Sequence, residues 1–171
     1  MVKRLRSEEG FGLLELLMSM TMLNIGILAL VAAFNSGAIA LQRASRISTA
    51  ASLADTQMER YRAITYAAIA LDNTSVSNTD SLYRSDPALG GSISNDVTTT
   101  TGCTSPLPNE CIPSRSTSGA DHRTYRVDTY ITYTTPTNGR QEKLVTVVVR
   151  DGRTNSTLAR EQSTFDASTG S

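Results

Sequence analysis

The sequence predicts an α+β protein in which one long N-terminal helix packs on a small antiparallel sheet. Three observations support this fold class. Residues 11–34 form an apolar run long enough for a membrane-spanning helix. Residues 35–71 contain no proline and repeat apolar or small side chains at helical spacing. Residues 125–171 carry the alternating and β-branched patterns that are typical of strands.

Length and charge narrow the range of partners. A chain of 171 residues has room for one globular domain of ordinary size and one long extra element. The 16 basic and 16 acidic side chains cancel, so no field of the whole molecule attracts nucleic acid or an anionic membrane. Ser, Thr and Asn crowd the second half of the chain, which indicates an exposed surface around a modest core.

The apolar run contains one ionisable side chain, Glu15. At ~1.5 Å of rise per residue a helix over 11–34 measures roughly 36 Å, enough to cross a hydrocarbon core of about 30 Å. Lys3, Arg4 and Arg6 precede it, so the N-terminus is expected in the cytoplasm and the rest of the chain outside. The run exceeds the apolar core of an ordinary secretory signal. Hydropathy alone is also compatible with a plain signal anchor.

Two residues are unusual for such an anchor. Gly10 separates the charged leader from the apolar run, and Glu15 lies near the start of that run. A carboxylate at the centre of a membrane-spanning helix costs roughly 2.5–3.5 kcal/mol and usually marks a partner charge or a function. Alternatively, Glu15 reaches headgroup water and interacts with the positive end of the helix dipole.

The segment EEGFGLLELL resembles the start of type IV pilins and type II secretion pseudopilins. The resemblance implies a pilin-like fold and a leader, residues 1–10, that a prepilin peptidase removes by cutting after Gly10. It also implies methylation of the new N-terminal amine on Phe11. Glu15 would then neutralise the N-terminal amine of a neighbouring subunit during assembly. Many major pilins carry a helix-kinking proline in this run, whereas this chain has Asn24 and Gly26, both weak helix formers.

Residues 35–71 are predicted to continue the helix as an amphipathic segment. Ile47, Ala50, Ala54, Met58, Tyr61, Ile64 and Ala68 follow one another in steps of three or four and define the face expected to pack on the sheet. Asp55, Glu59 and Arg62 fall on the opposite, solvated face. The stretch ASRISTAASLADTQMERYRAI is similar to minor pilins of the V class and pseudopilins of the I class, which implies a minor subunit.

Residues 72–124 are rich in Ser, Thr, Asn, Asp and Gly and are predicted to form a long irregular loop, with a short strand near 92–99. Because Cys103 and Cys111 lie on the oxidising side of the membrane, we expect a disulfide between them. Cys103, Cys111 and His122 lack the spacing of a known metal site, and Asp121 with His122 lacks a nucleophile motif. We therefore expect no metal, no cofactor and no enzymatic activity.

Three strands are predicted in the last third of the chain. Residues 125–133 alternate in polarity, and 143–150 form a more buried β-branched strand. Asn138 and Gly139 supply the turn of a hairpin between them. A weaker strand over 156–165 is expected at an edge of the sheet.

The resemblance implies a structural subunit of a filament and names its partners: a prepilin peptidase, other pilin subunits, an assembly platform with its ATPase, and the cytoplasmic membrane crossed once. Type IV pili, secretion pseudopili and competence filaments share this N-terminal signal. An alternative is an extracytoplasmic adhesin or DNA-uptake module, for which the candidate residues are Arg123, Arg126, Arg140, Arg150 and Arg153. A third hypothesis is a membrane-anchored enzyme or sensor.

Overall fold

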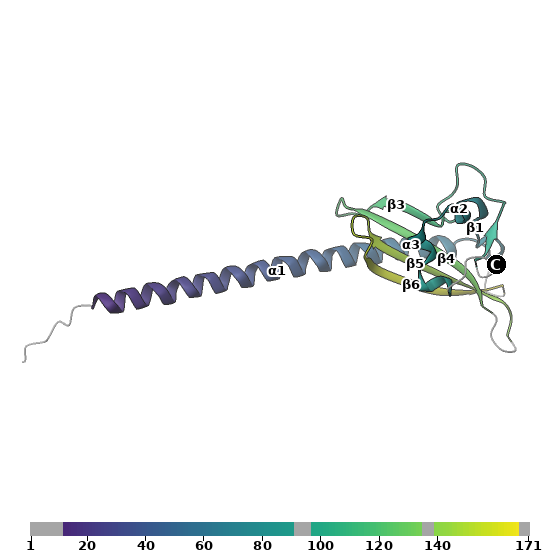
Figure 1. Cartoon of the computed structure of the whole chain (residues 1–171). Coiled ribbons are helices and arrows are strands. Elements are labelled where there is room, and N and C mark those ends of the chain that lie inside the picture. Colours follow the sequence, from purple (N-terminus) through teal and green to yellow (C-terminus); the bar gives the residue numbers. More distant parts are fainter. Residues whose placement is uncertain (1–11, 91–96, 135–138, 168–171) are drawn as a thin grey trace, which may run out of the picture. The chain divides into compact units, whose positions relative to one another are not determined.

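The computed structural model describes residues 12–90, 97–134 and 139–167 (Figure 1). The predicted leader, Gly10, Phe11 and the hairpin residue Asn138 lie outside the described residues, as does most of the strand expected near 92–99. The chain divides into two compact units, one ending at Arg43 and one beginning at Ala44. The elements are α1 (Leu13–Arg62), η1 (Tyr66–Ala68), β1 (Leu71–Asp72), α2 (Asn73–Ser77), α3 (Ser81–Arg84), η2 (Pro87–Leu89), β2 (Thr99–Thr100), β3 (Ser114–Ser118), β4 (Thr124–Thr134), β5 (Glu142–Asp151) and β6 (Thr157–Asp166).

The first unit contains the apolar part of α1. The helix runs without interruption through Asn24 and Gly26. A Cβ built on Gly26 would meet no atom within 4 Å, so no contact with the described part of the chain requires a glycine at that position. The two weak helix formers are therefore accommodated in a continuous helix.

The amphipathic helix was expected to reach about Leu71, and this boundary is wrong. α1 ends at Arg62, and the chain turns through η1 before it enters β1. Lys143 fixes this turn, because its ammonium donates to the carbonyl oxygens of Tyr66 and Ile69 at 2.7 and 2.8 Å. The apolar residues that follow the helix pack on the same core as an extended segment, which explains why they continued its hydrophobic pattern.

Four antiparallel strands form the main sheet in the order β3-β4-β5-β6. The predicted hairpin is present as β4 and β5, with a register that runs from Tyr125 opposite Asp151 to Thr134 opposite Glu142. β5 is the more buried of the two predicted hairpin strands, with every residue from Val145 to Arg150 buried. The predicted edge strand is β6, which pairs only with β5 among the described strands. The α+β fold class is confirmed.

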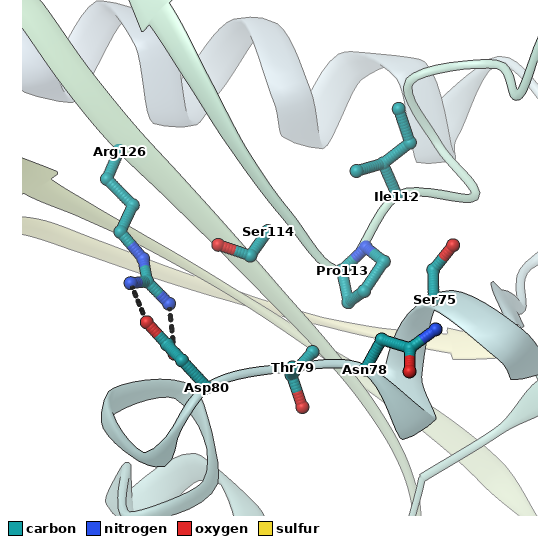
Figure 2. A pocket seen from close by; sticks show the side chains of 8 residues that line it. All are labelled: Ser75, Asn78, Thr79, Asp80, Ile112, Pro113, Ser114 and Arg126. Atoms are coloured by element: carbon teal, nitrogen blue, oxygen red, sulfur yellow. Dashed lines mark hydrogen bonds and ion pairs between the residues drawn. The ribbon is translucent and has the colours of Figure 1, made fainter.

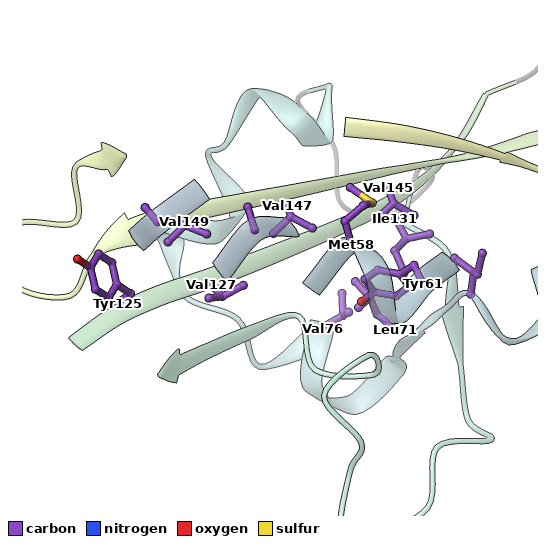
Figure 3. Packing of buried hydrophobic residues seen from close by; sticks show 13 residues of the cluster. Met58, Tyr61, Leu71, Val76, Tyr125, Val127, Ile131, Val145, Val147 and Val149 are labelled. Atoms are coloured by element: carbon purple, nitrogen blue, oxygen red, sulfur yellow. The ribbon is translucent and has the colours of Figure 1, made fainter. Parts of the chain in front are cut away.

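One face of the sheet packs against the second half of α1. Ala50, Ala54, Met58 and Tyr61 are buried on the helix, as its periodicity predicted. Figure 3 shows Met58 and Tyr61 among inward-facing side chains of β4 and β5. The cluster also contains Ile69, Leu71, Val76, Tyr125, Val127, Ile131, Val145, Val147 and Val149. This apolar contact is the principal core of the second unit.

The opposite face of the sheet is covered by the segment that runs from α3 to η2. Tyr83 and Leu89 pack there on Tyr130 and Val148. The rings of Tyr83 and Tyr130 stack with centroids 4.3 Å apart. The region 72–124, predicted to be irregular, thus contributes a second layer and also the edge strand β3. Asp72, Asp80 and Asp86 cap its short helical turns by accepting backbone N–H bonds, which organises a segment too polar to show periodicity.

Candidate functional site

The apolar surface of α1 is the first candidate site. From Leu13 to Leu41 the large apolar side chains are exposed, with exposed fractions of 79% at Leu13, 78% at Phe34 and 74% at Leu41. By length and composition this helix is able to cross a membrane. Apolar surface of this extent is not stable in water and marks a membrane or protein contact.

Glu15 lies in the first turn of α1, where the partial positive charge of the helix N-terminus favours a carboxylate. Its backbone N–H donates to the carbonyl of Gly12 at 2.9 Å, and its own carbonyl accepts from Ser19 Oγ at 2.6 Å. Its carboxylate makes no ion pair with any described residue. Glu15 is the single ionisable side chain between Leu13 and Leu41 and lies on a largely apolar helix surface.

The disulfide between Cys103 and Cys111 is present, as predicted, with the two Cα atoms 6.4 Å apart. The end of its loop is attached to α1, because Tyr61 Oη donates to the Glu110 carbonyl at 2.7 Å and Gln57 Nε2 to the Asn109 carbonyl at 3.1 Å. Sequence reasoning missed Gln57, a fully buried amide on the packed face of α1. Burial raises the pKa of the Tyr61 hydroxyl to about 12.

The two catalytic or metal arrangements considered from sequence are not assembled. Both cysteines are consumed by the disulfide. His122 is exposed in the turn between β3 and β4, where its φ of 59° places it in the left-handed region. Asp121 accepts the hydroxyl of Tyr125 at 2.6 Å and the backbone N–H of Arg123. The described residues contain no group of three or more potential metal ligands.

A chain of alternating charges lies on the sheet face covered by α3 and η2. Arg126 donates to both carboxylate oxygens of Asp80, at 2.5 and 2.7 Å, and its Nε donates to Asp128 at 2.8 Å. Arg150 Nε donates to the other oxygen of Asp128 at 3.0 Å, and its Nη2 donates to Asp86. The Ser114 hydroxyl also donates to Asp128, and Arg150 Nη1 donates to the Thr157 hydroxyl. Arg160 Nη2 donates to both carboxylate oxygens of Asp86.

This network changes the interpretation of the arginines proposed for DNA. Arg126 and Arg150 are largely buried and neutralised by aspartates. Arg123 and Arg153 lie at the end of the sheet where β4 begins and β5 ends, whereas Arg140 follows the other end of β4. The five arginines do not form one surface. Sequence reasoning missed Asp80 and Asp86, although each precedes a short helical turn in the pattern of an N-cap.

A polar pocket of about 440 Å³ opens beside this network (Figure 2). The Asp80–Arg126 pair lies on one side of the pocket, and Ile112 and Pro113 lie across from it. Ser75, Asn78, Thr79 and Ser114 supply hydroxyl and amide groups to the lining. Such a lining suits a polar, uncharged ligand, since its only ionic groups already pair with each other.

The ion pair between Asp80 and Arg126 at the pocket predicts a pH-dependent contribution to the stability of the fold. The hydrogen bond from Arg126 lowers the pKa of Asp80 to about 2. Since the unfolded value is ~3.9, ionised Asp80 stabilises the fold above about pH 4, and this contribution is lost as the pH falls through 2. The side chain is half exposed, so solvent screening reduces the effect.

We expect the Asp80→Asn variant to unfold at a lower temperature than the wild type near pH 6 and at nearly the same temperature near pH 2. Asparagine also caps helices, so the variant removes the charge and keeps the cap. Near-ultraviolet circular dichroism of the full-length chain in detergent would follow the transition, because all six tyrosines lie beyond Arg43. An equal difference at both pH values would contradict the assignment to the ionised carboxylate.

Comparisons with known proteins identify no relative: no family model, no curated protein and no solved structure matches the chain.

Proposed function

We propose that this chain is a structural, non-enzymatic filament subunit of the pilin or pseudopilin type, trimmed after Gly10 and assembled through α1. The observation that carries the proposal is the exposed apolar surface of α1 with one carboxylate, Glu15, in its first turn that makes no ion pair with any described residue. A membrane alone would cover the apolar side chains but would supply no counter-charge. A neighbouring subunit that presents its N-terminal amine supplies both.

The fold supports the same assignment. The second half of α1 is packed on a four-stranded antiparallel sheet, so one helix carries both the apolar surface and part of the folded second unit. We call this second unit, which begins at Ala44, the outer unit. The chain would first cross the cytoplasmic membrane once, with its N-terminus inside, and would then enter an extracellular or periplasmic filament. The V-class and I-class likeness of residues 44–64, at the end of α1, favours a minor subunit. Its partners would be a prepilin peptidase, other pilins, an assembly platform and the ATPase.

The test is mass spectrometry of the N-terminal peptide of protein made in its native host. We expect the peptide to begin at Phe11 and to carry one added methyl group. The Gly10→Val variant is expected to keep the leader, because a branched side chain replaces the small residue before the cleaved bond. Gly12→Val is the matched control and should be processed normally. A wild-type chain that retains residues 1–10 would instead be a plain membrane-anchored outer domain.

A binding role on the filament surface is the second candidate, and the polar pocket favours it. Its hydroxyl and amide lining is suited to hydrogen bonding with a polar ligand such as a sugar. DNA capture has less support, because three of the five candidate arginines, Arg123, Arg126 and Arg150, are engaged in internal ion pairs.

A further inference from the structure

Among the described residues of the second unit, two arginines combine the lack of an ion-pair partner with a buried Nε atom that has no hydrogen-bond partner. Arg60 lies on α1 and Arg115 lies on the edge strand β3. Neither forms an ion pair with any described residue, and the Nε atom of each is buried without a hydrogen-bond partner. Arg115 Nη2 donates to Gln57 Oε1 at 3.1 Å, an uncharged acceptor. We call Arg60 and Arg115 the basic flank.

The electrostatics of the basic flank are unfavourable in the isolated chain. Burial, followed by the positive charge of Arg60, lowers the pKa of the Arg115 guanidinium. The nearby Glu110 contributes its backbone carbonyl to Tyr61, and its carboxylate pairs with neither arginine. No counter-charge for these two partly buried cations lies among the described residues, so an anionic group from outside the chain would stabilise them.

Carboxylates gather on the other side of α1. Asp55 and Glu59 are exposed on the helix, and Glu161 lies on β6, the opposite edge strand of the sheet. Burial and the negative charge of Asp55 raise the pKa of Glu161. Arg62 forms an ion pair with Glu59, and its Nη2 lies 3.6 Å from Glu161 Oε1. This one cation therefore faces the three carboxylates of Asp55, Glu59 and Glu161. We call Asp55, Glu59 and Glu161 the acidic flank.

The two flanks point in different directions. Successive residues of an α-helix are rotated by about 100°, so Arg60 and the row formed by Asp55, Glu59 and Arg62 leave the buried face of α1 on opposite sides. The contacts agree with this geometry, since Arg115 of β3 reaches Gln57 and Arg62 reaches Glu161 of β6. β3 and β6 are the two edges of the four-stranded sheet. The basic flank and the acidic flank therefore lie toward opposite edges of the sheet.

We infer that the basic flank of one copy of this chain binds the acidic flank of the next. The contact joins different surfaces, so it is heterologous and leaves one unused flank on each of the two copies, where a further subunit can bind. A second copy fits better than an unrelated partner because the complementary charges are already present on this chain. The inference rests on the proposed filament role and specifies how the outer units meet.

Site-specific cross-linking tests the contact. Two differently tagged full-length chains, one with Arg60→Cys and one with Glu59→Cys, are expressed together, and cells are treated with a short bis-maleimide. The native cysteines are joined in a disulfide and do not react. We expect a product of twice the chain mass that carries both tags. Ser77→Cys, exposed on α2, replaces Arg60→Cys in the matched control and should give no such product.

Charge reversal provides an independent measurement. The Arg60→Glu/Arg115→Glu variant should reduce the amount of chain in sheared filaments about tenfold, because like charges then meet across the contact. Adding Asp55→Arg and Glu59→Arg to the same chain should restore incorporation. Processing at Phe11 and the tyrosine circular dichroism of each variant verify that it is folded.

The outcomes separate the two proposals. A wild-type chain absent from all filaments contradicts the filament role itself. A chain that enters filaments without the mixed cross-link, or with an equally strong product between two Arg60→Cys chains, overturns the heterologous contact. A cross-linked product of any other mass overturns the choice of a second copy as partner.

Discussion

Replacement of Asp128 by alanine is expected to lower the free energy of unfolding of the outer unit by about 3–5 kcal/mol. Asp128 is fully buried, and its two oxygens accept from Arg126 and Arg150. Removal of the carboxylate leaves both guanidinium groups with one carboxylate partner fewer and removes the acceptor of Ser114 Oγ. Because whole domains are stable by only about 5–15 kcal/mol, the variant loses a large share of its stability.

Denaturant unfolding of the full-length chain in detergent, followed by tyrosine circular dichroism, measures this loss. Asp55→Ala is the matched control, because it also removes one aspartate but from an exposed helix position. Its effect should stay within about 0.5 kcal/mol. A loss below about 1 kcal/mol for Asp128→Ala would show that the buried cations find other partners and that the network adds little to stability.

The second large effect is expected at Glu15. The Glu15→Val variant should insert into the membrane at least as well as the wild type, since burial of the carboxylate costs roughly 2.5–3.5 kcal/mol at a helix centre and less near its end. Its incorporation into filaments should nevertheless fall at least about tenfold, because the proposed partner amine loses its counter-charge. Membrane and sheared filament fractions, compared by immunoblot, separate the two steps.

Two controls define the role of the carboxylate. Glu15→Asp retains the charge and should preserve part of the incorporation. Ser19→Val removes one polar group a single turn further along α1, where its hydroxyl donates only to the Glu15 carbonyl, and should have little effect. Normal filament levels with Glu15→Val would contradict a charge-pairing role and would favour the interpretation that Glu15 merely reaches headgroup water.

Periodicity was sufficient to predict the packed face of α1 and the hairpin strands β4 and β5, but it did not predict the edge strand β3. The alternation around Val127 and the β-branched run around Val147 gave β4 and β5, and the spacing of Ala50, Ala54 and Met58 gave the packed face of α1. The end of α1 was not predictable in the same way. The residues beyond Arg62 remain apolar because they join the same core, and hydrophobic spacing does not distinguish a helix from a buried turn.

The second face of the sheet was missed for a different reason. Alternation places Asp128 and Tyr130 on the outward side of β4, where polar residues normally meet water. Here a segment distant in sequence, from Asp80 to Leu89, covers them and supplies the opposite charges. Long-range pairs of this kind leave no periodic signal in a single sequence. The disulfide could be predicted because its two cysteines are close in sequence and are the only ones in the chain.

The bridge between Cys103 and Cys111 also sets a mechanical property of the subunit. A chain pulled from its two ends gains about 3.4 Å for each residue that straightens. The residues between the two cysteines cannot add to this extension, because the disulfide carries the tension past them. Asn109 and Glu110, whose carbonyls accept from Gln57 and Tyr61 in the folded chain, lie inside this closed loop, so a stretched subunit would keep the segment that contacts α1 as a covalently closed ring.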